Sequence, residues 1–178
     1  KWNRIVNLTS ARTSADFLNQ HIVDGLAIVP HLVGEINIID VGSGCGVPGV
    51  ALGIMCPDSK VTLLEPRERR ARFLEQVRIE LDLPNVVVVG SKVEDVCSNF
   101  SASRPTLITR AFGTMSKFVK LVLPLIETGS KVCFMKSEVD AADLENAEAV
   151  LGDNYVISLE VPGYRRRSLI IFNNSSDD

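Results

Sequence analysis

The chain has 178 residues, of which 46% are hydrophobic and 23% are charged. This length and composition predict one globular domain and exclude a disordered or collagen-like chain. The net charge of −3 excludes a uniformly basic nucleic-acid-binding module.

Three further features narrow the class of protein. No apolar run approaches the ~18 residues of a membrane span, so we expect no membrane partner. Two histidines and four scattered cysteines predict neither a zinc site nor a disulfide framework, and reduced thiols indicate a cytoplasmic location. The first residues have no initiator Met and no signal-peptide pattern, so we expect residue 1 to lie inside a longer gene product.

Strand and helix patterns alternate along the chain. In chain order, the spacing of apolar residues predicts a helix over 17–29, a strand over 36–41, a helix over 48–55, a strand over 61–65, a helix that begins at Pro66, strands over 86–89 and 107–109, a helix over 115–126, a strand over 132–135, a helix over 141–151, and strands over 155–161 and 168–172. Apolar strands alternating with amphipathic helices predict an α/β fold with a mostly parallel sheet, covered on both faces. Because the last two strands are too close for a helical crossover, we expect one antiparallel strand at the sheet edge.

A glycine-rich loop, D-V-G-S-G-C-G-V-P-G, lies between the first predicted strand and the next helix, from Asp40 to Gly49. Glycines let the backbone turn sharply and approach a ligand closely, and the helix start offers free N–H groups to an anion. Glu65 ends the second predicted strand, where doubly wound sheets accept hydrogen bonds from ribose hydroxyls. The pattern therefore predicts an adenosine-containing ligand at the carboxyl end of the sheet.

The loop alone leaves two cofactors open. Gly44, Gly46 and Gly49 satisfy the dinucleotide pattern G-x-G-x-x-G, which keeps a nicotinamide oxidoreductase as an alternative. Asp40 completes the pattern D-x-G-x-G-x-G of methyl-donor sites, and no catalytic substrate domain follows. Both details favour S-adenosylmethionine. Cys45 lies inside the loop, but nothing nearby in the sequence would activate its thiol, so we interpret it as a packing residue.

Six short motifs stand in the order in which one known family has them. They are N-L-T (7–9), H-I-V-D (21–24), I-D-V-G-S-G-C-G-V-P-G (39–49), R-R-A-R-F-L (69–74), S-K-V-E-D (91–95) and T-R-A-F (109–112). Many methyltransferases share the glycine loop, whereas its V-P-G ending combined with V-E-D and T-R-A-F is far more specific. In these motifs the chain resembles the bacterial 16S ribosomal RNA guanine-N7 methyltransferase G family (RsmG, also called GidB).

The resemblance implies a class I S-adenosylmethionine-dependent methyltransferase with a Rossmann-like, seven-stranded sheet. It implies a single domain over 1–178, with an N-terminal cap helix region at 1–34 and a Rossmann-like core at 35–178. The implied reaction is methylation at N7 of a guanine in 16S ribosomal RNA, with S-adenosylmethionine as cofactor and no metal. The implied partner is 16S ribosomal RNA or the small ribosomal subunit, and we expect a monomer.

Carried over residue by residue, the resemblance also implies a site. The expected cofactor-binding residues are Gly42, Gly44, Gly46, Val47, Glu65, Val93, Glu94 and Arg110, and Arg110 is also the expected catalytic residue. Gly42 and Val47 would line the donor site, Val93 and Glu94 would lie at the adenine, and Glu65 would lie near the ribose. The chain departs from the family pattern at residues 19–20 and 136–137, where a specific RNA contact would be affected.

The chemistry of guanine N7 needs few catalytic groups. N7 carries an unprotonated lone pair at neutral pH and can attack the sulfonium methyl directly, so catalysis reduces to alignment. The planar guanidinium of Arg110 suits the acceptor edge of guanine or a phosphate, and an ordinary surface arginine is the alternative. His21 and Asp24 share a helix face, which we interpret as a pair steadying that helix, with a substrate-side role as the alternative.

The distribution of charge favours RNA more than the total does. Residues 137–153 hold six carboxylates and no basic residue, and Asp177 and Asp178 add two more. The remaining residues carry 19 basic and 14 acidic side chains, including clusters at 67–72, 104–120 and 165–167. Such clusters are what phosphate contacts require. Two alternatives stay open: a methyltransferase acting on a small molecule or protein, and a non-catalytic ribosome-associated binding module.

Overall fold

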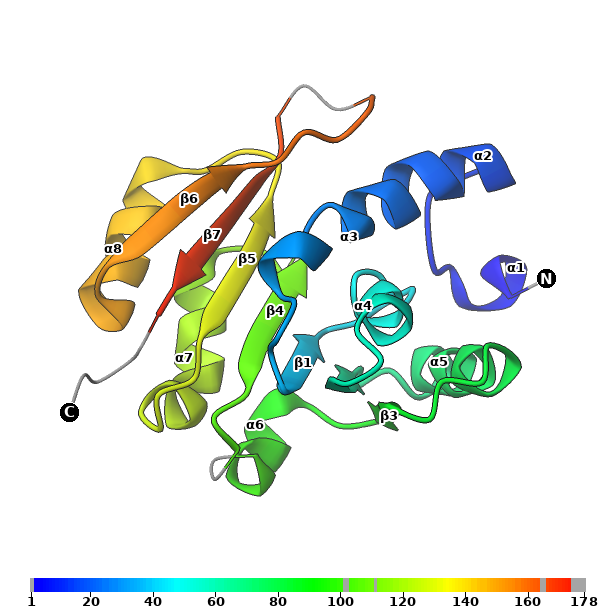
Figure 1. Ribbon diagram of the computed structural model, residues 1–178, viewed down its shortest axis with the longest axis horizontal. Helices are drawn as coiled ribbons and strands as arrows, with labels where there is room; N and C mark the ends of the chain where they lie inside the picture. The colour runs from blue at the N-terminus through cyan, green and yellow to red at the C-terminus, as the bar shows by residue number, and fades with distance from the viewer. Residues whose placement is uncertain (1, 101–102, 111, 164–165, 174–178) are drawn as a thin grey trace.

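Seven strands form one sheet in the computed structural model, which describes residues 2–100, 103–110, 112–163 and 166–173 (Figure 1). The strands are β1 (Asn37–Val41), β2 (Lys60–Leu64), β3 (Val86–Val89), β4 (Thr106–Arg110), β5 (Val132–Lys136), β6 (Asn154–Ser158) and β7 (Ser168–Phe172). They confirm the predicted α/β fold. Residues 111, 164, 165, 177 and 178, to which the sequence motifs and charge clusters extend, lie outside the described residues.

The order of the strands is β3-β2-β1-β4-β5-β7-β6. β1 pairs in parallel with both β2 and β4, so that Ile39 lies opposite Thr62 on one side and Leu107 on the other. The chain builds the sheet outward from β1 to β3 and then returns to add β4 on the other side of β1, so the strand order reverses between the neighbours β1 and β4. In open α/β sheets, ligands bind beyond the carboxyl ends of the strands at such a reversal.

The final strand pair is antiparallel, as predicted, but its place in the sheet differs from the prediction. β7 is antiparallel to both of its neighbours, β5 and β6, so the antiparallel strand lies one position inside the edge. The residues explain this order. The apolar run Leu169–Phe172 is buried on both faces, whereas Tyr155 and Val156 of β6 are about half exposed. A strand with a continuous apolar run needs cover on both faces, and the more polar β6 takes the edge.

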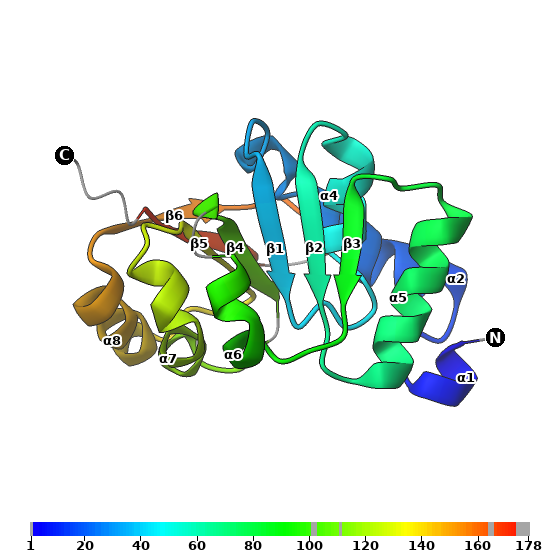
Figure 2. The same ribbon diagram turned by 90° about the horizontal axis from the view of Figure 1, so that it is seen from below.

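Two apolar cores lie on opposite faces of the sheet. One packs beneath η2 (Val29–His31), α4 (Gly49–Met55) and α5 (Glu68–Glu80). The other packs beneath α6 (Val93–Val96), η3 (Cys97–Asn99), α7 (Met115–Ile126) and α8 (Ala141–Leu151). Figure 2 shows α6, α7 and α8 on one side of the sheet and α4 on the other. In the described part of the chain, no helix is long and apolar enough to cross a membrane.

Several element boundaries differ from the prediction. The helix predicted over 17–29 begins earlier, as α2 (Ser14–Phe17), because Thr13 and Asp16 form a reciprocal capping box with both hydrogen bonds at 3.0 Å. It continues through the π-helical turns of η1 (Leu18–Val23) into α3 (Asp24–Leu26). The short helices α1 (Asn3–Val6) and α6 were not predicted, β6 is shorter than the predicted strand, and α4 and α5 begin after Pro48 and Pro66.

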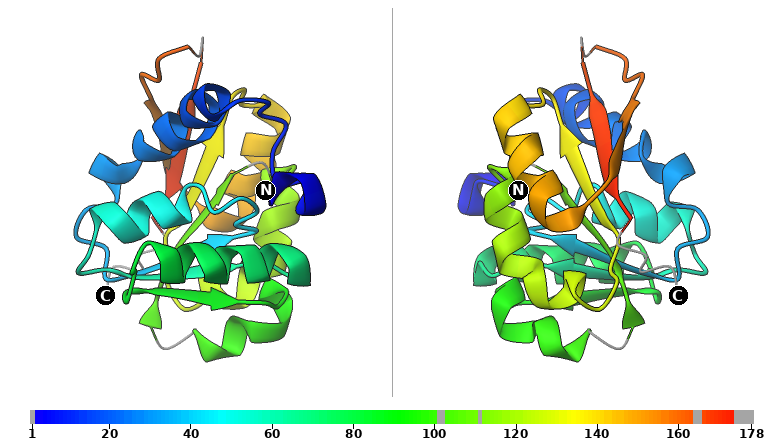
Figure 3. Two further views of the ribbon diagram at one scale, coloured as in Figure 1. Left: turned by 90° about the vertical axis from the view of Figure 1, so that its right-hand side faces the viewer. Right: turned by 90° about the vertical axis from the view of Figure 1, so that its left-hand side faces the viewer.

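The N-terminal helical segment, from α2 to α3, crosses the molecule beside α4 and reaches the connection between β6 and β7 (Figure 3). This places residues from the start of the chain at the carboxyl ends of the central strands. A hydrogen bond between Asp24 and Arg167 joins the two regions.

Candidate functional site

A cavity of about 490 Å³ opens at the carboxyl ends of β1, β2 and β3. The residues that line it are Val41, Gly42, Leu64, Glu65, Pro66, Arg67, Arg70, Lys92, Val93, Glu94, Phe112, Lys117 and Leu121. Four predicted cofactor-binding residues are among them: Gly42, Glu65, Val93 and Glu94. The ends of β1 and β2 and the start of α6 thus bring these four together, although they are far apart in the sequence.

The glycine loop holds a backbone conformation that other residues rarely adopt. Gly42, Gly44 and Gly46 have φ values of +76°, +58° and +89°. A Cβ atom added to Gly42 would lie 3.3 Å from the ring of Phe112. The N–H groups of Gly42 and Ser43 both donate to the carbonyl of Leu64, at 2.8 and 3.1 Å, and so fasten the loop across the end of β2.

Glu65 connects the glycine loop to the start of α5. Its carboxylate accepts the N–H of Gly44 at 3.0 Å through one oxygen and the N–H of Arg67 at 2.9 Å through the other. The side chain is almost fully buried, yet it lines the cavity. Each carboxylate oxygen keeps a second lone pair that could accept from a hydroxyl. The sequence suggested only the ligand contact, and the structure adds a role in shaping the loop.

Asp40 lies beneath the loop and supports it from inside. The carboxylate is buried and accepts the N–H of Gly49, the first residue of α4, at 3.0 Å. Burial raises the pKa of Asp40 to about 6, against the opposing effect of the hydrogen bonds from Gly49 and Ser43. A Cβ on Gly49 would come within 2.6 Å of the Asp40 carboxylate, so only glycine fits there. Asp40 is therefore a buried support of the loop.

Four predicted cofactor-binding residues do not line this cavity: Gly44, Gly46, Val47 and Arg110. Val47 is buried and lines a separate apolar cavity of about 390 Å³ between the N-terminal helices and α4 and α5. Gly46 packs so tightly that a Cβ would lie 2.8 Å from Val50 and 2.9 Å from Leu74. Cys45 lines the same apolar cavity, and burial raises the pKa of its thiol, which agrees with a packing role. Gly46 and Val47 therefore lie in apolar surroundings, and their contact with the cofactor stays a prediction.

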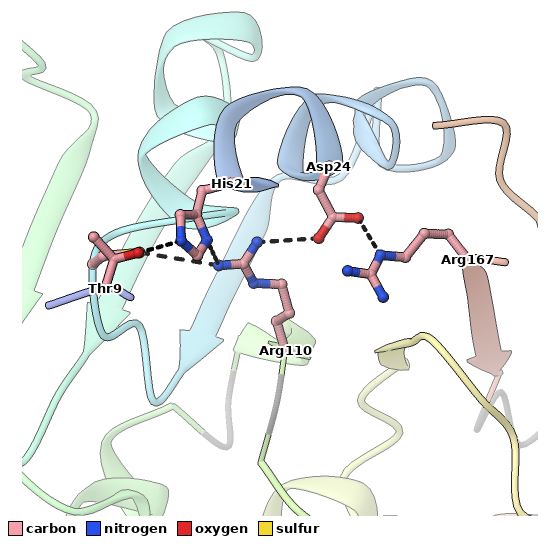
Figure 4. Close-up of polar contacts among 6 residues, drawn as sticks. Thr9, His21, Asp24, Arg110 and Arg167 are labelled. Carbon is pink, nitrogen blue, oxygen red and sulfur yellow. Dashed lines mark hydrogen bonds and ion pairs between the residues drawn. The ribbon is translucent and has the colours of Figure 1, made fainter. Parts of the chain in front are cut away.

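Arg110, at the end of β4, lies at the centre of a polar cluster (Figure 4). Its Nη1 donates to Asp24 Oδ2 at 3.1 Å, and its Nη2 donates to His21 Nδ1 at 2.7 Å. The second oxygen of Asp24 accepts from Arg167 Nε at 2.7 Å. The expected local pair of His21 and Asp24 is therefore replaced by two contacts to Arg110. Sequence spacing placed the two on one helix face but gave no sign of Arg110 or Arg167, which are distant in the chain.

The contacts of His21 define its protonation. An arginine only donates, so Nδ1 of His21 is the acceptor, and Nε2 lies 2.5 Å from the hydroxyl of Thr9. Burial lowers the pKa of His21, the charge of Arg110 lowers it further, and Asp24 opposes them. The neutral imidazole thus fixes the direction of the Arg110 guanidinium without adding charge.

A second polar cavity, of about 320 Å³, opens beside this cluster at the carboxyl ends of β4 and β5. It is lined by Gln20, His21, Asp24, Arg110, Met135, Lys136, Ser137 and Arg167. Because β4 pairs directly with β1, this cavity adjoins the strand ends that carry the glycine loop. In the described residues, no group of three His, Cys, Asp or Glu side chains could hold a metal ion.

The basic residues at the start of α5 divide into two kinds. Arg72 forms an exposed ion pair with Glu68 at 2.5 Å, as expected for a solvated helix face. Arg70 instead donates to the carbonyl of Asn7 at 3.1 Å and lines the larger polar cavity. Of the basic turn at 165–167, Arg166 and Arg167 are described, and Arg167 lines the smaller polar cavity. Parts of the basic clusters therefore surround the two polar cavities.

Comparison with known proteins identifies the family. Residues 1–170 match the family model of rRNA small subunit methyltransferase G. The chain belongs to this family. Ribosomal RNA small subunit methyltransferase G of Nitrosospira multiformis is 39% identical over an alignment that covers 98% of this chain and 83% of that protein. The Chromobacterium violaceum protein of the same name is 37% identical, over 92% of this chain and 77% of its own length.

The fold of this family member is shared with more distant methyltransferases. A crystal structure of an S-adenosylmethionine-dependent methyltransferase from Aquifex aeolicus superposes with a TM-score of 0.58 at 16% identity, covering 97% of this chain and 98% of that one. The likeness confirms the predicted class I methyltransferase fold. With the family match, it also confirms the resemblance that the sequence motifs predicted.

Proposed function

We propose that this protein is an S-adenosylmethionine-dependent methyltransferase that methylates N7 of a guanine in 16S ribosomal RNA. The observation that carries the proposal is the pair of polar cavities at the carboxyl edge of the sheet, one at the ends of β1, β2 and β3 and the other at the ends of β4 and β5. One is shaped by a glycine loop with a buried carboxylate, and the other is lined by arginines. Membership of the rRNA small subunit methyltransferase G family supports the assignment of the substrate.

The larger polar cavity fits S-adenosylmethionine. A volume of about 490 Å³ lies within the usual range for small-ligand sites. Gly42 leaves the cavity open beside Phe112, and Glu65 offers carboxylate oxygens to ribose hydroxyls. Val93 and Glu94, the first residues of α6, line the cavity and would hold the adenine. When bound, the cofactor supplies an electrophilic methyl group on a sulfonium.

The smaller polar cavity fits the acceptor. Guanine N7 needs no general base, and Arg110 is always protonated, so it could not act as one. Its guanidinium can instead donate to guanine O6 or to a phosphate, which leaves N7 free to attack. The role of this chain's residues is therefore to hold the base in line with the donor and to exclude water. Alignment of that kind can contribute several kcal/mol to catalysis.

The cap region at 1–34 is proposed to close over the core at 35–178, because His21 and Asp24 reach Arg110 from it. We also propose that the protein acts as a cytoplasmic monomer on 16S ribosomal RNA or on the small subunit. Gel filtration with light scattering tests the monomer, and a mass of two chains would refute it.

The experiment that tests the function combines binding and transfer. Thermal shift should show stabilisation by S-adenosylmethionine and none by NAD, because ligands raise the melting temperature only if they bind the folded state. Labelled methyl groups should then pass to 16S ribosomal RNA from cells that lack the modification. The Arg110→Ala variant should lose transfer, whereas Arg78→Ala, which removes an arginine paired with Glu75 on α5, should retain it. Transfer only to a metabolite or protein, or RNA binding without turnover, would contradict the proposal.

A further inference from the structure

A single carboxylate joins two arginines that lie 57 residues apart in the chain. Asp24, at the start of α3, accepts from Arg110 with one oxygen and from Arg167 with the other, at 3.1 and 2.7 Å. Arg110 ends β4, and Arg167 immediately precedes β7. Figure 4 shows the Asp24 carboxylate lying between the two guanidinium groups.

The burial of the three groups is unequal. The Asp24 side chain is 2% exposed, whereas the arginine side chains keep 17% and 18% of their surface. A carboxylate so deeply buried needs its partners, because an unpaired buried charge is strongly destabilising. The arginine side chains, although mostly buried, keep more exposed surface than Asp24 does, and both line the smaller polar cavity. Asp24 also lines this cavity, but it exposes so little surface that the two arginines present most of the charged surface to the space where the acceptor would enter.

The charges of the cluster do not cancel. Two arginines share one carboxylate, and His21 accepts from Arg110 through an unprotonated nitrogen. Lys136 also lines the cavity and donates to the carbonyl of Gly113. The cavity therefore keeps a positive surplus, which suits the electronegative O6 edge of guanine or the phosphate beside it.

We infer that Asp24 is a positioning residue for methyl transfer, which fixes Arg110 and Arg167 in the relative orientation that receives the target nucleotide. The inference rests on the proposed function and deepens it. Asp24 acts through the two arginines and need not touch the substrate. Arg110 is held from two sides, by Asp24 and by His21, and this restricts rotation of its guanidinium.

The test uses Asp24→Asn and separates the steps of the reaction. The asparagine oxygen can accept from one arginine, but its NH₂ group faces the other arginine and cannot accept. Donor affinity, measured calorimetrically with S-adenosylmethionine, should stay within about threefold of the wild-type value, because the donor cavity does not contain Asp24. The kcat per donor-binding site on 16S ribosomal RNA should fall about 100-fold, as for a misplacement of about 1 Å. KM for RNA should change little, because many phosphate contacts set RNA affinity. Asp24→Glu, which keeps the carboxylate, should recover part of kcat.

Asp16→Asn is the matched control. Asp16 lies on the same helical segment, where it forms the capping box with Thr13, and it lines neither polar cavity, so its loss should lower the melting temperature and leave kcat unchanged. If Asp24→Asn binds donor and keeps wild-type kcat, the inference is wrong. If Asp24→Asn fails to fold, Arg167→Gln decides, because it leaves Asp24 paired with Arg110. A kcat at least about tenfold lower then supports the inference, and an unchanged kcat overturns it. If the wild-type protein methylates no ribosomal RNA, the proposed function itself fails, a result distinct from an active wild type with an equally active variant.

Discussion

The unfolding free energy of the Asp40→Asn variant, compared with that of the wild type at the same pH, should increase as pH rises from acidic to neutral. Burial raises the pKa of this carboxyl group from its ordinary 3.8 to about 6, so the folded protein binds the proton more tightly than the unfolded chain. The wild type therefore loses stability as pH rises from the unfolded value through the folded one. Asparagine does not titrate, yet it can still accept the N–H of Gly49.

The size of the effect follows from the two pKa values. The full difference corresponds to about 3 kcal/mol, of which about 2 kcal/mol falls between pH 4.5 and pH 7.5. The quantity to compare is the unfolding free energy of Asp40→Asn minus that of the wild type. This difference removes the contributions of other titrating groups and also any constant cost of the substitution itself.

The assay is urea unfolding of both proteins at pH 4.5, 6.0 and 7.5, followed by circular dichroism. The difference should grow steadily in favour of Asp40→Asn as pH rises. A difference that stays constant over this range would refute the reasoning, because it would mean that the Asp40 carboxylate has the same proton affinity in the folded and unfolded chains. A difference that shrinks with rising pH would mean that the loop stabilises the charged form.

Four further predictions concern the two polar cavities. Gly42→Val should abolish stabilisation by S-adenosylmethionine in thermal shift, because φ is +76° and a Cβ would lie 3.3 Å from Phe112; normal stabilisation would place the donor elsewhere. Glu65→Ala should weaken donor binding by ~1.5–3 kcal/mol in calorimetry, since a charged acceptor is lost, and an unchanged affinity would restrict Glu65 to its bond with Gly44. Burial lowers the pKa of His21 below 6.5 in the folded protein, so the unfolded chain binds a proton at this site more tightly than the folded protein does. The unfolding free energy therefore decreases as pH falls below 6.5. His21→Asn should reduce this loss between pH 7 and pH 5, and equal profiles would contradict the assigned contacts. Affinity for ribosomal RNA should fall steeply between low and moderate salt in a filter-binding assay, and a flat response would exclude phosphate contacts as its main source.

Much of the fold could be predicted because its signals are local. The apolar runs at 36–41, 61–65 and 86–89 are strands, and the glycine loop lies between a strand and a helix, as expected. The position of β7 could not be read from spacing. Spacing predicts only that the last two strands are antiparallel. β7 occupies the interior position because it is more apolar than β6, which lies at the exposed edge.

The site was predictable to a similar degree. Arg110, the last residue of β4, and Glu65, which directly follows β2, lie at the carboxyl edge as expected, because parallel strands align their ends there. Val47 lines a separate apolar cavity, whose shape depends on how the N-terminal helices pack against α4, so its contact with the donor stays a prediction. The bond between Asp24 and Arg167 spans 143 residues of sequence and has no local signal. A helical H-x-x-D pattern and an arginine-rich turn were visible, but nothing in their spacing linked them.

The central claim is tested most directly by identifying the methylated atom. Small subunits from cells lacking the modification are incubated with the protein and with S-adenosylmethionine labelled in its methyl group. The 16S ribosomal RNA is then cleaved by reduction and aniline treatment, which breaks the chain at N7-methylguanosine. The account predicts label in 16S ribosomal RNA and one new cleavage site at a guanine, both absent with Arg110→Ala. Label at another atom or in another molecule, or donor binding with no transfer to RNA, would contradict it.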